Sequence, residues 1–235
     1  MGNDSNACVI IAGGTGLVGK EVMAKLVSQP SIETLYSLSR RTITGIEDPN
    51  NKIVPLLDAA LTIHDWDDQQ PIPRVGFICL GTTLKQAGSK DALRKIDVEL
   101  VCKVAQQMKM IGVKRIAVVS SLGAKASSSS HYLACKGHME KNIERMGFEE
   151  VVFARPGPLV GQRENPRTDE KVVQTLSKVI RPLMLGKLAN FVPVHAQDVA
   201  KAMIYQVFSY QEEKVIYLHR KHGKIIINGN FWTNR

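Results

Sequence analysis

The sequence predicts an α/β protein built on a doubly wound parallel sheet. Short apolar runs rich in Val and Ile alternate with longer amphipathic segments along the 235 residues. Several of these runs, such as residues 8–12 and 116–119, are apolar throughout. A strand of this kind is buried on both faces, as in a parallel sheet that helices cover on both sides.

In the amino-terminal half, apolar runs predict strands and one helix. The run at Ala7–Ala12 leads through a glycine-rich turn into an amphipathic segment at Leu17–Ser28, which ends before Pro30 and predicts a helix. The next runs are short and separated by Gly and Pro residues. They predict strands at Thr34–Ser39, Lys52–Leu57 and Val75–Leu80.

In the carboxyl-terminal half the alternation continues. Amphipathic segments predict helices at Asp91–Ile111, His131–Met146, Lys171–Leu183 and Gln197–Phe208. Apolar runs predict strands at Arg115–Ser120, Glu150–Ala154 and Val215–His219. The segment after Gly223 resembles a hairpin or a packed or frayed tail. Because no long linker divides the chain, we predict one domain over residues 1–235, with a small substrate region at about 156–213 and the last strand and a basic tail at 214–235.

The charge of the chain is unevenly distributed. The net charge is +9, and residues 214–235 contain five basic residues and no acidic one, so the body is only mildly basic. No continuous Lys/Arg block or aromatic RNA-binding signature accompanies the excess. The sequence therefore disfavours a nucleic-acid partner, and an anionic small molecule explains the charge of the body equally well.

Metal sites, membrane spans and secretion have no support in the sequence. The cysteines at 8, 79, 102 and 135 form no C-x-x-C pair, and His219 and His222 have no other candidate ligand near them. No run approaches the roughly 20 apolar residues of a membrane span. Residues 1–13 have neither a basic start nor a small-residue cleavage site. We therefore expect a cytosolic protein without a metal.

A glycine-rich turn follows the first strand directly. Its sequence, GGTGLVG, satisfies G-x-G-x-x-G from Gly14 and opens the first helix. Glycines let backbone N–H groups approach a pyrophosphate, and the positive end of the helix dipole faces that charge. This arrangement belongs to Rossmann-like sheets and predicts a dinucleotide site that includes Gly13, Gly14, Thr15, Gly16, Leu17, Val18 and Gly19.

Two further strand ends are candidates for cofactor contacts. An NAD-selective protein would place an acid at the end of the second strand, whereas this chain has Ser39, Arg40 and Arg41 there. Arginine attracts the 2′-phosphate of NADP, so the sequence favours NADP(H) over NAD(H). The fourth strand ends in small residues that can pass beside the cofactor: Leu80, Gly81, Thr82 and Thr83.

A tyrosine and a lysine follow the fifth strand. That strand ends in Ser120 and Ser121, and Tyr132 and Lys136 come at the start of the next helix, where their i, i+4 spacing puts them on one face. An ammonium group beside a phenol favours the ionised phenol. Tyr132 can thus exchange a proton with a substrate while a nicotinamide exchanges a hydride. Two other pairs share this spacing, but neither follows a strand that ends in hydroxyls: Tyr210/Lys214 and Tyr217/Lys221.

With these motifs the chain resembles an atypical short-chain dehydrogenase/reductase, close to the Tat-interacting-protein oxidoreductase group and its bacterial NAD(P)-binding relatives. The matching stretches span about residues 7–165 and are Gly13–Gly19, Arg40–Arg41, Cys79–Thr83 with Gly88 and Asp97, Val119–Ala124, Tyr132–Glu140, Arg155–Gly157 and Gly161–Arg163. The resemblance implies that Tyr132 and Lys136 are catalytic, that Ser120 or Ser121 polarises the substrate, and that Pro156 and Gly157 border the nicotinamide.

The expected function is reversible hydride transfer to or from a small carbonyl or alcohol, with Tyr132 as the acid/base. An anionic substrate would suit Arg163 in the segment after the sixth strand. Two alternatives remain open: a non-catalytic NADPH-binding regulator and a sugar-nucleotide epimerase-like enzyme. Family analogy also suggests a homodimer through the helices at 91–111 and 131–146, although these are equally consistent with ordinary crossover helices.

Overall fold

A nine-stranded sheet forms the centre of the molecule. The computed structural model describes residues 7–64, 66–67, 69–160, 193–209, 215–221, 224–227 and 230–231. In spatial order the strands are β11 (Asn230–Phe231), β10 (Lys224–Ile227), β9 (Val215–Lys221), β6 (Glu150–Pro156), β5 (Arg115–Val119), β4 (Val75–Ile78), β1 (Ala7–Ala12), β2 (Ile32–Ser39) and β3 (Ile53–Leu57). The strands from β3 to β9 run parallel, as the sequence predicts.

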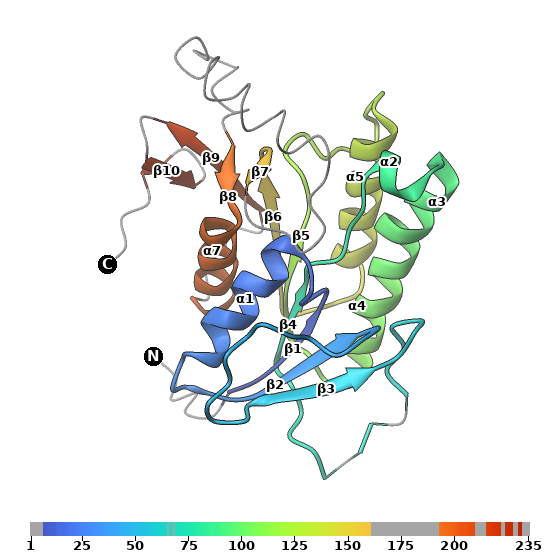
Figure 1. The fold of residues 1–235 in the computed structure, drawn as a ribbon. Coiled ribbons are helices and arrows are strands. Elements are labelled where there is room, and N and C mark those ends of the chain that lie inside the picture. The colour runs from blue at the N-terminus through green and yellow to red at the C-terminus, as the bar shows by residue number, and fades with distance from the viewer. Residues whose placement is uncertain are drawn as a thin grey trace.

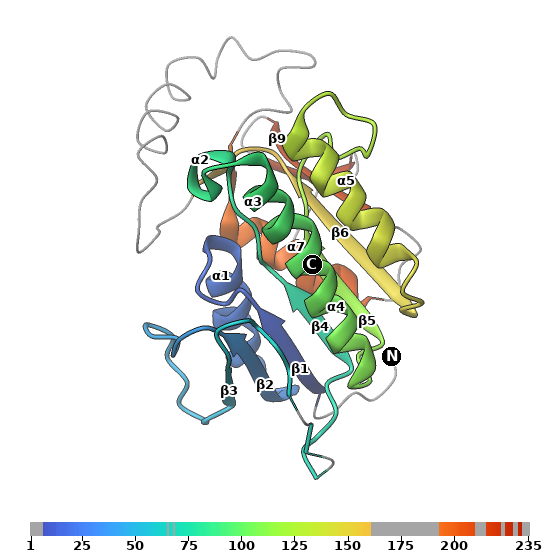
Figure 2. The same cartoon turned by 90° about the vertical axis from the view of Figure 1, so that its right-hand side faces the viewer.

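Helices cover both faces of the sheet (Figures 1 and 2). Helices α1 (Leu17–Val27) and α7 (Ala196–Phe208) pack against one face, where alternate β1 residues such as Val9 and Ile11 meet Val22 and Met203. The opposite face carries α4 (Val101–Met110) and α5 (His131–Glu144), which enclose the other β1 side chains. The doubly wound fold class is thus confirmed.

The helix predicted at Asp91–Ile111 is composite. It consists of α3 (Lys90–Arg94), a π-helical segment η1 (Lys95–Leu100) and α4. A short helix that the sequence analysis missed, α2 (Leu84–Ala87), precedes it and is capped by the hydroxyl of Thr83. A π-helical turn accommodates an extra residue, so it changes which side chains point towards the sheet.

The predicted strand positions are correct within a few residues. β2 begins two residues earlier than predicted because Ile32 already pairs with Ala7. β6 continues to Pro156 and β9 to Lys221. The tail after Gly223 forms antiparallel strands, and a further pair, β7 (Leu159–Val160) and β8 (Val194–His195), lies outside the main sheet. The helix predicted at Lys171–Leu183 lies outside the described residues.

The strand order reverses at β1. From β1 the chain passes to β2 on one side, and later returns through β4 on the other side. The backbone N–H of Cys79 donates to the Ala12 carbonyl at 2.8 Å, which joins the two strands where both end. In doubly wound sheets this switch point at the carboxyl ends of the strands is where ligands bind.

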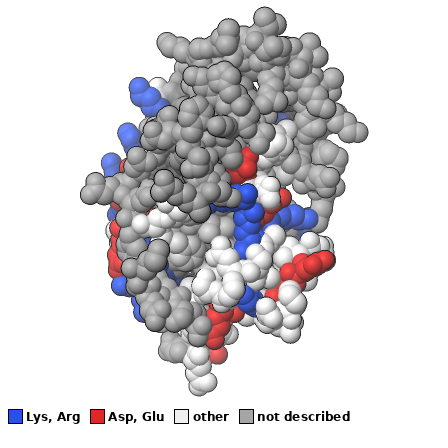
Figure 3. All heavy atoms as spheres, turned by 90° about the vertical axis from the view of Figure 1, so that its left-hand side faces the viewer, with Lys and Arg blue, Asp and Glu red and all other residues white. Residues whose placement is uncertain are grey.

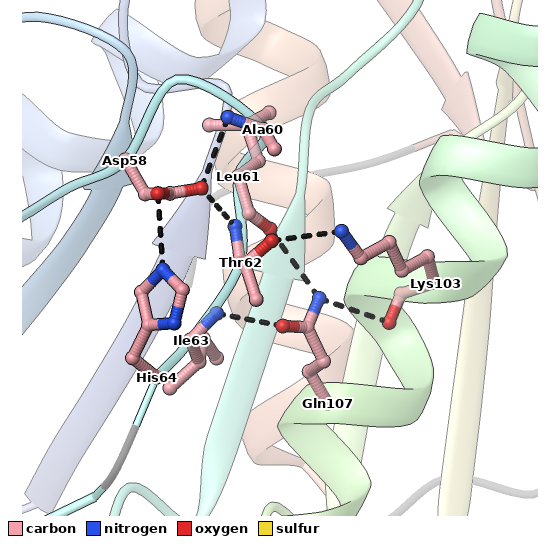
Figure 4. Close-up of polar contacts among 8 residues, drawn as sticks. All are labelled: Asp58, Ala60, Leu61, Thr62, Ile63, His64, Lys103 and Gln107. Atoms are coloured by element: carbon pink, nitrogen blue, oxygen red, sulfur yellow. Dashed lines mark hydrogen bonds and ion pairs between the residues drawn. The ribbon is translucent and has the colours of Figure 1, made fainter.

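A polar network holds the loop after β3 against α4 (Figure 4). The Asp58 carboxylate accepts N–H bonds from Ala60 and Thr62, and lies 3.1 Å from a His64 ring nitrogen. The bond from the Thr62 N–H is the largest of the interactions that lower the pKa of Asp58. Gln107 of α4 accepts from the Ile63 N–H at 2.6 Å. These bonds fix the loop against the carboxyl-terminal part of α4.

Candidate active site

The glycine-rich turn is closed tightly against β4. Gly13 has a φ of +88°, and a Cβ atom there would lie 2.7 Å from the carbonyl carbon of Cys79. Only glycine combines this backbone conformation with so close an approach. Its carbonyl accepts the Gly16 N–H at 3.0 Å, which completes the turn before α1.

The turn leads directly into the first turn of α1. Gly16 is the N-cap and offers no side-chain cap, so the N–H groups of the first helical turn remain directed at the switch point. Leu17 and Val18 bury their side chains in the core, whereas Thr15 is only partly buried. A Cβ atom on Gly19 would lie 2.1 Å from the Gly13 carbonyl oxygen. These residues therefore fit a pyrophosphate, which binds helix N–H groups where the backbone can approach closely.

The two arginines lie at the end of β2, beside the glycine turn. Arg40 and Arg41 are exposed, and the buried Ser39 hydroxyl donates to the Arg41 carbonyl at 2.8 Å. Ile43, two residues further, packs over Gly14: a Cβ atom on that glycine would meet it at 2.7 Å. The loop that carries the arginines therefore borders the glycine turn.

Lys136 connects α5 to the loop after β4. Its ammonium lies 3.0 Å from Oδ1 of Asp97, and the exposed fractions of the two side chains are 3% and 0%. A Cβ atom on Gly81 would lie 3.2 Å from this ammonium and 3.0 Å from the same carboxylate oxygen. Removing one partner of such an enclosed ion pair costs about 3–5 kcal/mol of stability. Because Gly81 has no side chain, the Lys136–Asp97 ion pair can lie against the loop after β4, at the switch point.

Tyr132 and the end of β5, which the two serines follow, lie near Lys136. The ammonium lies 6.0 Å from the centre of the Tyr132 ring and 3.5 Å from the Val119 carbonyl at the end of β5. The Ser120 hydroxyl is buried and has no hydrogen-bond partner among the described residues. The Ser121 hydroxyl is partly exposed and makes only a long, 3.5 Å bond to the Leu122 carbonyl.

The end of β6 closes this side of the site. The Pro156 carbonyl accepts the N–H of Leu122 at 2.9 Å, and the Gly157 N–H donates to the Leu218 carbonyl at 3.2 Å. Arg155, just before them, pairs with Glu140 of α5 through its Nε at 2.9 Å and through a second nitrogen. This pair ties α5 to β6 one helical turn after Lys136.

The predicted site residues thus gather at the carboxyl edge of the sheet. Neighbouring strands end in, or lead directly into, Gly13–Gly19, Leu80–Thr83, Ser120–Ser121 and Pro156–Gly157. Helix α5 carries Tyr132 and Lys136 in its first two turns. It begins at the same edge of the sheet (Figure 2). Arg163 and the pair Tyr210/Lys214 lie outside the described residues. The nearby Cys135 thiol is buried, and its burial raises its pKa. This thiol is therefore a poor nucleophile at neutral pH.

Asp97 has a place in the site that the sequence analysis did not assign. It stood only among the positions of the family resemblance. A signal was present: Leu93, Asp97 and Val101 follow one another at helical spacing, and the carboxylate stands between apolar neighbours that are both buried. A buried carboxylate requires a cationic partner.

The described residues contain no group of three or more His, Cys, Asp or Glu side chains that could hold a metal ion. None of the helices described is long and apolar enough to cross a membrane. Figure 3 shows basic and acidic side chains side by side on the described part of one face. That part of the surface has charges of both signs.

This chain is similar to one family model and to several proteins of fungi and of the rat. The HIM1 family model matches residues 74–189. The mitochondrial protein FMP52 of Candida albicans is 33% identical over 83% of this chain and 85% of its own length. The mitochondrial protein fmp52 of Emericella nidulans is 32% identical over 72% and 73%. Protein HTATIP2 of Rattus norvegicus is 32% identical over 70% of this chain and 68% of its own length.

Solved structures share the fold at low sequence identity. MoeE5 in complex with UDP-glucose and NAD is 14% identical, with a TM-score of 0.64 over 94% of this chain and 78% of its own. UDP-glucose 4-epimerase of Thermotoga maritima has a TM-score of 0.62 over 93% and 78%, also at 14% identity. These likenesses show a shared fold, and the MoeE5 structure contains NAD.

The relatives correct one prediction. The absence of a targeting pattern in residues 1–13 led us to expect a cytosolic protein, whereas the FMP52 relatives are named as mitochondrial proteins. The cytosolic prediction is therefore wrong. The N-terminal pattern was a poor guide because targeting signals are recognised by composition and amphipathicity rather than by one fixed motif.

Proposed function

The chain belongs to the family of the FMP52 and HTATIP2 proteins, and on this premise we propose that it is an NADP(H)-dependent oxidoreductase that acts on a small carbonyl or alcohol. HTATIP2 is among the relatives, in agreement with the resemblance to the Tat-interacting-protein group. The fold supports a nicotinamide dinucleotide cofactor. The reaction and the preference for NADP(H) are our proposal.

One observation carries the proposal. The ammonium of Lys136 reaches Gly81 at the end of β4, the strand that also closes the glycine turn through Cys79. The glycine turn and the Lys136 ammonium therefore both lie against the residues that follow β4, which supports one continuous site there. A dinucleotide whose pyrophosphate lies on Gly13–Gly19 would extend along this edge of the sheet towards Tyr132.

Each residue has a role in this proposal. The N–H groups of Gly13–Gly19 would hold the pyrophosphate, and Arg40 and Arg41 the 2′-phosphate. Leu80–Thr83, Pro156 and Gly157 would line the ribose and nicotinamide end. Lys136 would hydrogen-bond the nicotinamide ribose. Tyr132 and Ser121 would contact the oxygen of the substrate.

A bound nicotinamide would supply a hydride, with its electron pair, to the carbonyl carbon. In this direction Tyr132 would donate its hydroxyl proton to the carbonyl oxygen and would then regain a proton from water. Incubation with NADPH and a panel of neutral and anionic aldehydes and ketones, followed by nicotinamide absorbance, tests this reaction. Consumption of NADPH with formation of the alcohol supports it.

The arginine pair should distinguish the two cofactors. The double substitution Arg40→Ala and Arg41→Ala is expected to weaken NADPH binding by roughly 10- to 100-fold, because charge-assisted bonds to the 2′-phosphate are lost. NADH binding should change less than about threefold. Calorimetric titration of both cofactors measures this. Arg74→Ala, at the opposite end of β4, is the control, and equal losses for both cofactors would refute the assignment.

The serines should also differ in effect. Ser121 is partly exposed, whereas the Ser120 hydroxyl is enclosed by protein. A hydroxyl must be accessible to contact a substrate. We therefore expect Ser121→Ala to lower kcat/KM by on the order of 100-fold and Ser120→Ala to change it little. Steady-state kinetics of both variants measure kcat/KM. A large loss in Ser120→Ala and a small one in Ser121→Ala would assign the substrate contact to Ser120.

A further inference from the structure

An ion pair joins α5 to the end of β6, one helical turn beyond Lys136. The Nε–H of Arg155 donates to Oε1 of Glu140 at 2.9 Å, and a second guanidinium nitrogen contacts Oε2. The exposed fractions of the two side chains are 17% and 5%. Two parallel contacts between a planar guanidinium and a carboxylate fix both distance and orientation. The pair therefore holds the helix at a defined spacing from the end of the strand.

Both members of the pair lie next to residues of the proposed site. On α5, Lys136 and Glu140 are four residues apart, so they share one face of the helix, and both are buried. On β6, Arg155 directly precedes Pro156 and Gly157. The residues proposed to hold the nicotinamide end thus include members of the two elements that the pair joins.

The serine loop, residues 120–126, is attached to β6 on both sides of Arg155. The Ser120 N–H donates to the carbonyl just before Arg155 at 2.7 Å. The Leu122 N–H donates to the carbonyl just after it, that of Pro156, at 2.9 Å. The position of the two proposed serines therefore depends on the position of the end of β6.

The other end of the serine loop lies on α5. The Lys125 N–H donates to the Leu133 carbonyl at 3.2 Å. A Cβ atom on Gly137 would lie 2.2 Å from the backbone nitrogen of Ala126, so only glycine permits this contact. The loop, α5 and the end of β6 therefore form one connected unit, in which the ion pair is a link made by side chains.

Resting on the proposed function, we propose that Glu140 and Arg155 are positioning residues, which set the spacing of the two elements that hold the nicotinamide half of the cofactor. Lys136 would contact this half from α5, and Pro156 and Gly157 from β6. The adenine half would lie on the glycine turn and the arginines at the end of β2, which belong to other strands. A change in the length of the pair should therefore weaken binding of the nicotinamide half selectively.

Binding of two ligands to the full-length protein, without turnover, tests the inference. Calorimetric titration compares NADPH with 2′,5′-ADP, which has the adenine and the 2′-phosphate but no nicotinamide half. Arg155→Lys keeps the charge but replaces the planar fork by a point charge. NADPH should bind about 10-fold more weakly, which corresponds to about one charge-assisted hydrogen bond, whereas the affinity for 2′,5′-ADP should change by less than about twofold.

The double variant Glu140→Leu/Arg155→Met separates positioning from stability. It removes both charges together, and replacing a buried ion pair by apolar residues of similar size is often neutral or stabilising. Its thermal unfolding temperature should stay close to that of the native protein, while NADPH again binds about 10-fold more weakly and 2′,5′-ADP as before.

The matched control removes an exposed ion pair just before β5 and β6, at their opposite ends. Lys114 and Glu149 form this pair at 2.7 Å. The variant Lys114→Gln/Glu149→Gln should change the affinity for neither ligand.

A loss that is selective for NADPH in both variants of the pair supports the inference, whether or not the protein turns over a carbonyl. Folded variants that keep the native affinity for NADPH overturn it. Equal losses for both ligands also overturn it, because they indicate a general structural role. A native protein that binds neither ligand refutes the proposed cofactor site itself, and the inference with it.

Discussion

Replacing Tyr132 by Phe is expected to lower kcat/KM for carbonyl reduction by about 10²–10⁴-fold, the usual contribution of a positioned proton donor. The substitution removes one oxygen from a partly buried ring at the start of α5 and keeps the rest of its packing. NADPH affinity should stay within about twofold, because the phenol is not among the groups proposed to hold the cofactor. Steady-state kinetics and equilibrium binding on the same preparation measure both quantities.

Tyr205→Phe is the matched control, because this exposed tyrosine lies on α7, on the opposite face of the sheet. It should leave both quantities unchanged. If the native protein binds NADPH and captures a protein partner in a cofactor-dependent way, without turnover and without any effect of Tyr132→Phe, the regulator alternative would replace the enzyme.

Replacing Gly19 by Ala should produce a large loss of cofactor binding. The added methyl group would lie 2.1 Å from the Gly13 carbonyl oxygen, and backbone cannot move aside as a flexible side chain can. Overpacking of this kind costs about 1–3 kcal/mol. Because the strain falls on the turn that would hold the pyrophosphate, NADPH affinity should fall by roughly 10- to 100-fold.

Thermal unfolding with and without NADPH measures this effect, since at a given concentration a ligand that binds more tightly stabilises the folded state more. The native protein should gain stability on adding NADPH, and Gly19→Ala should gain much less. Glu21→Ala, two residues further along α1, controls for disturbance of the helix. An undiminished gain in Gly19→Ala would place the cofactor elsewhere.

The fold was largely predictable because its signals are local. Strands buried on both faces are apolar throughout, as Val9–Ala12 shows, and breakers separate them from the helices. The glycine turn was equally readable because it requires glycine at fixed positions. The predicted members of the site therefore lie at the edge where parallel strands end.

The π-helical turn and the ion pair between Asp97 and Lys136 could not be predicted in this way. The partner of Asp97 lies 39 residues away on another helix, so only packing brings the two together. The extra residue of η1 leaves no clear mark on a helical pattern. Ser120 and Ser121 are likewise adjacent in sequence, and only the direction of β5 separates an enclosed hydroxyl from an accessible one.

Calorimetric titration of the folded native chain with NADPH tests the central claim most directly. The account predicts saturable heat that corresponds to one site per chain, with weaker binding of NADH. Absence of heat with both NADPH and NADH from well-folded protein would contradict a dinucleotide site at Gly13–Gly19, and with it the proposed reaction.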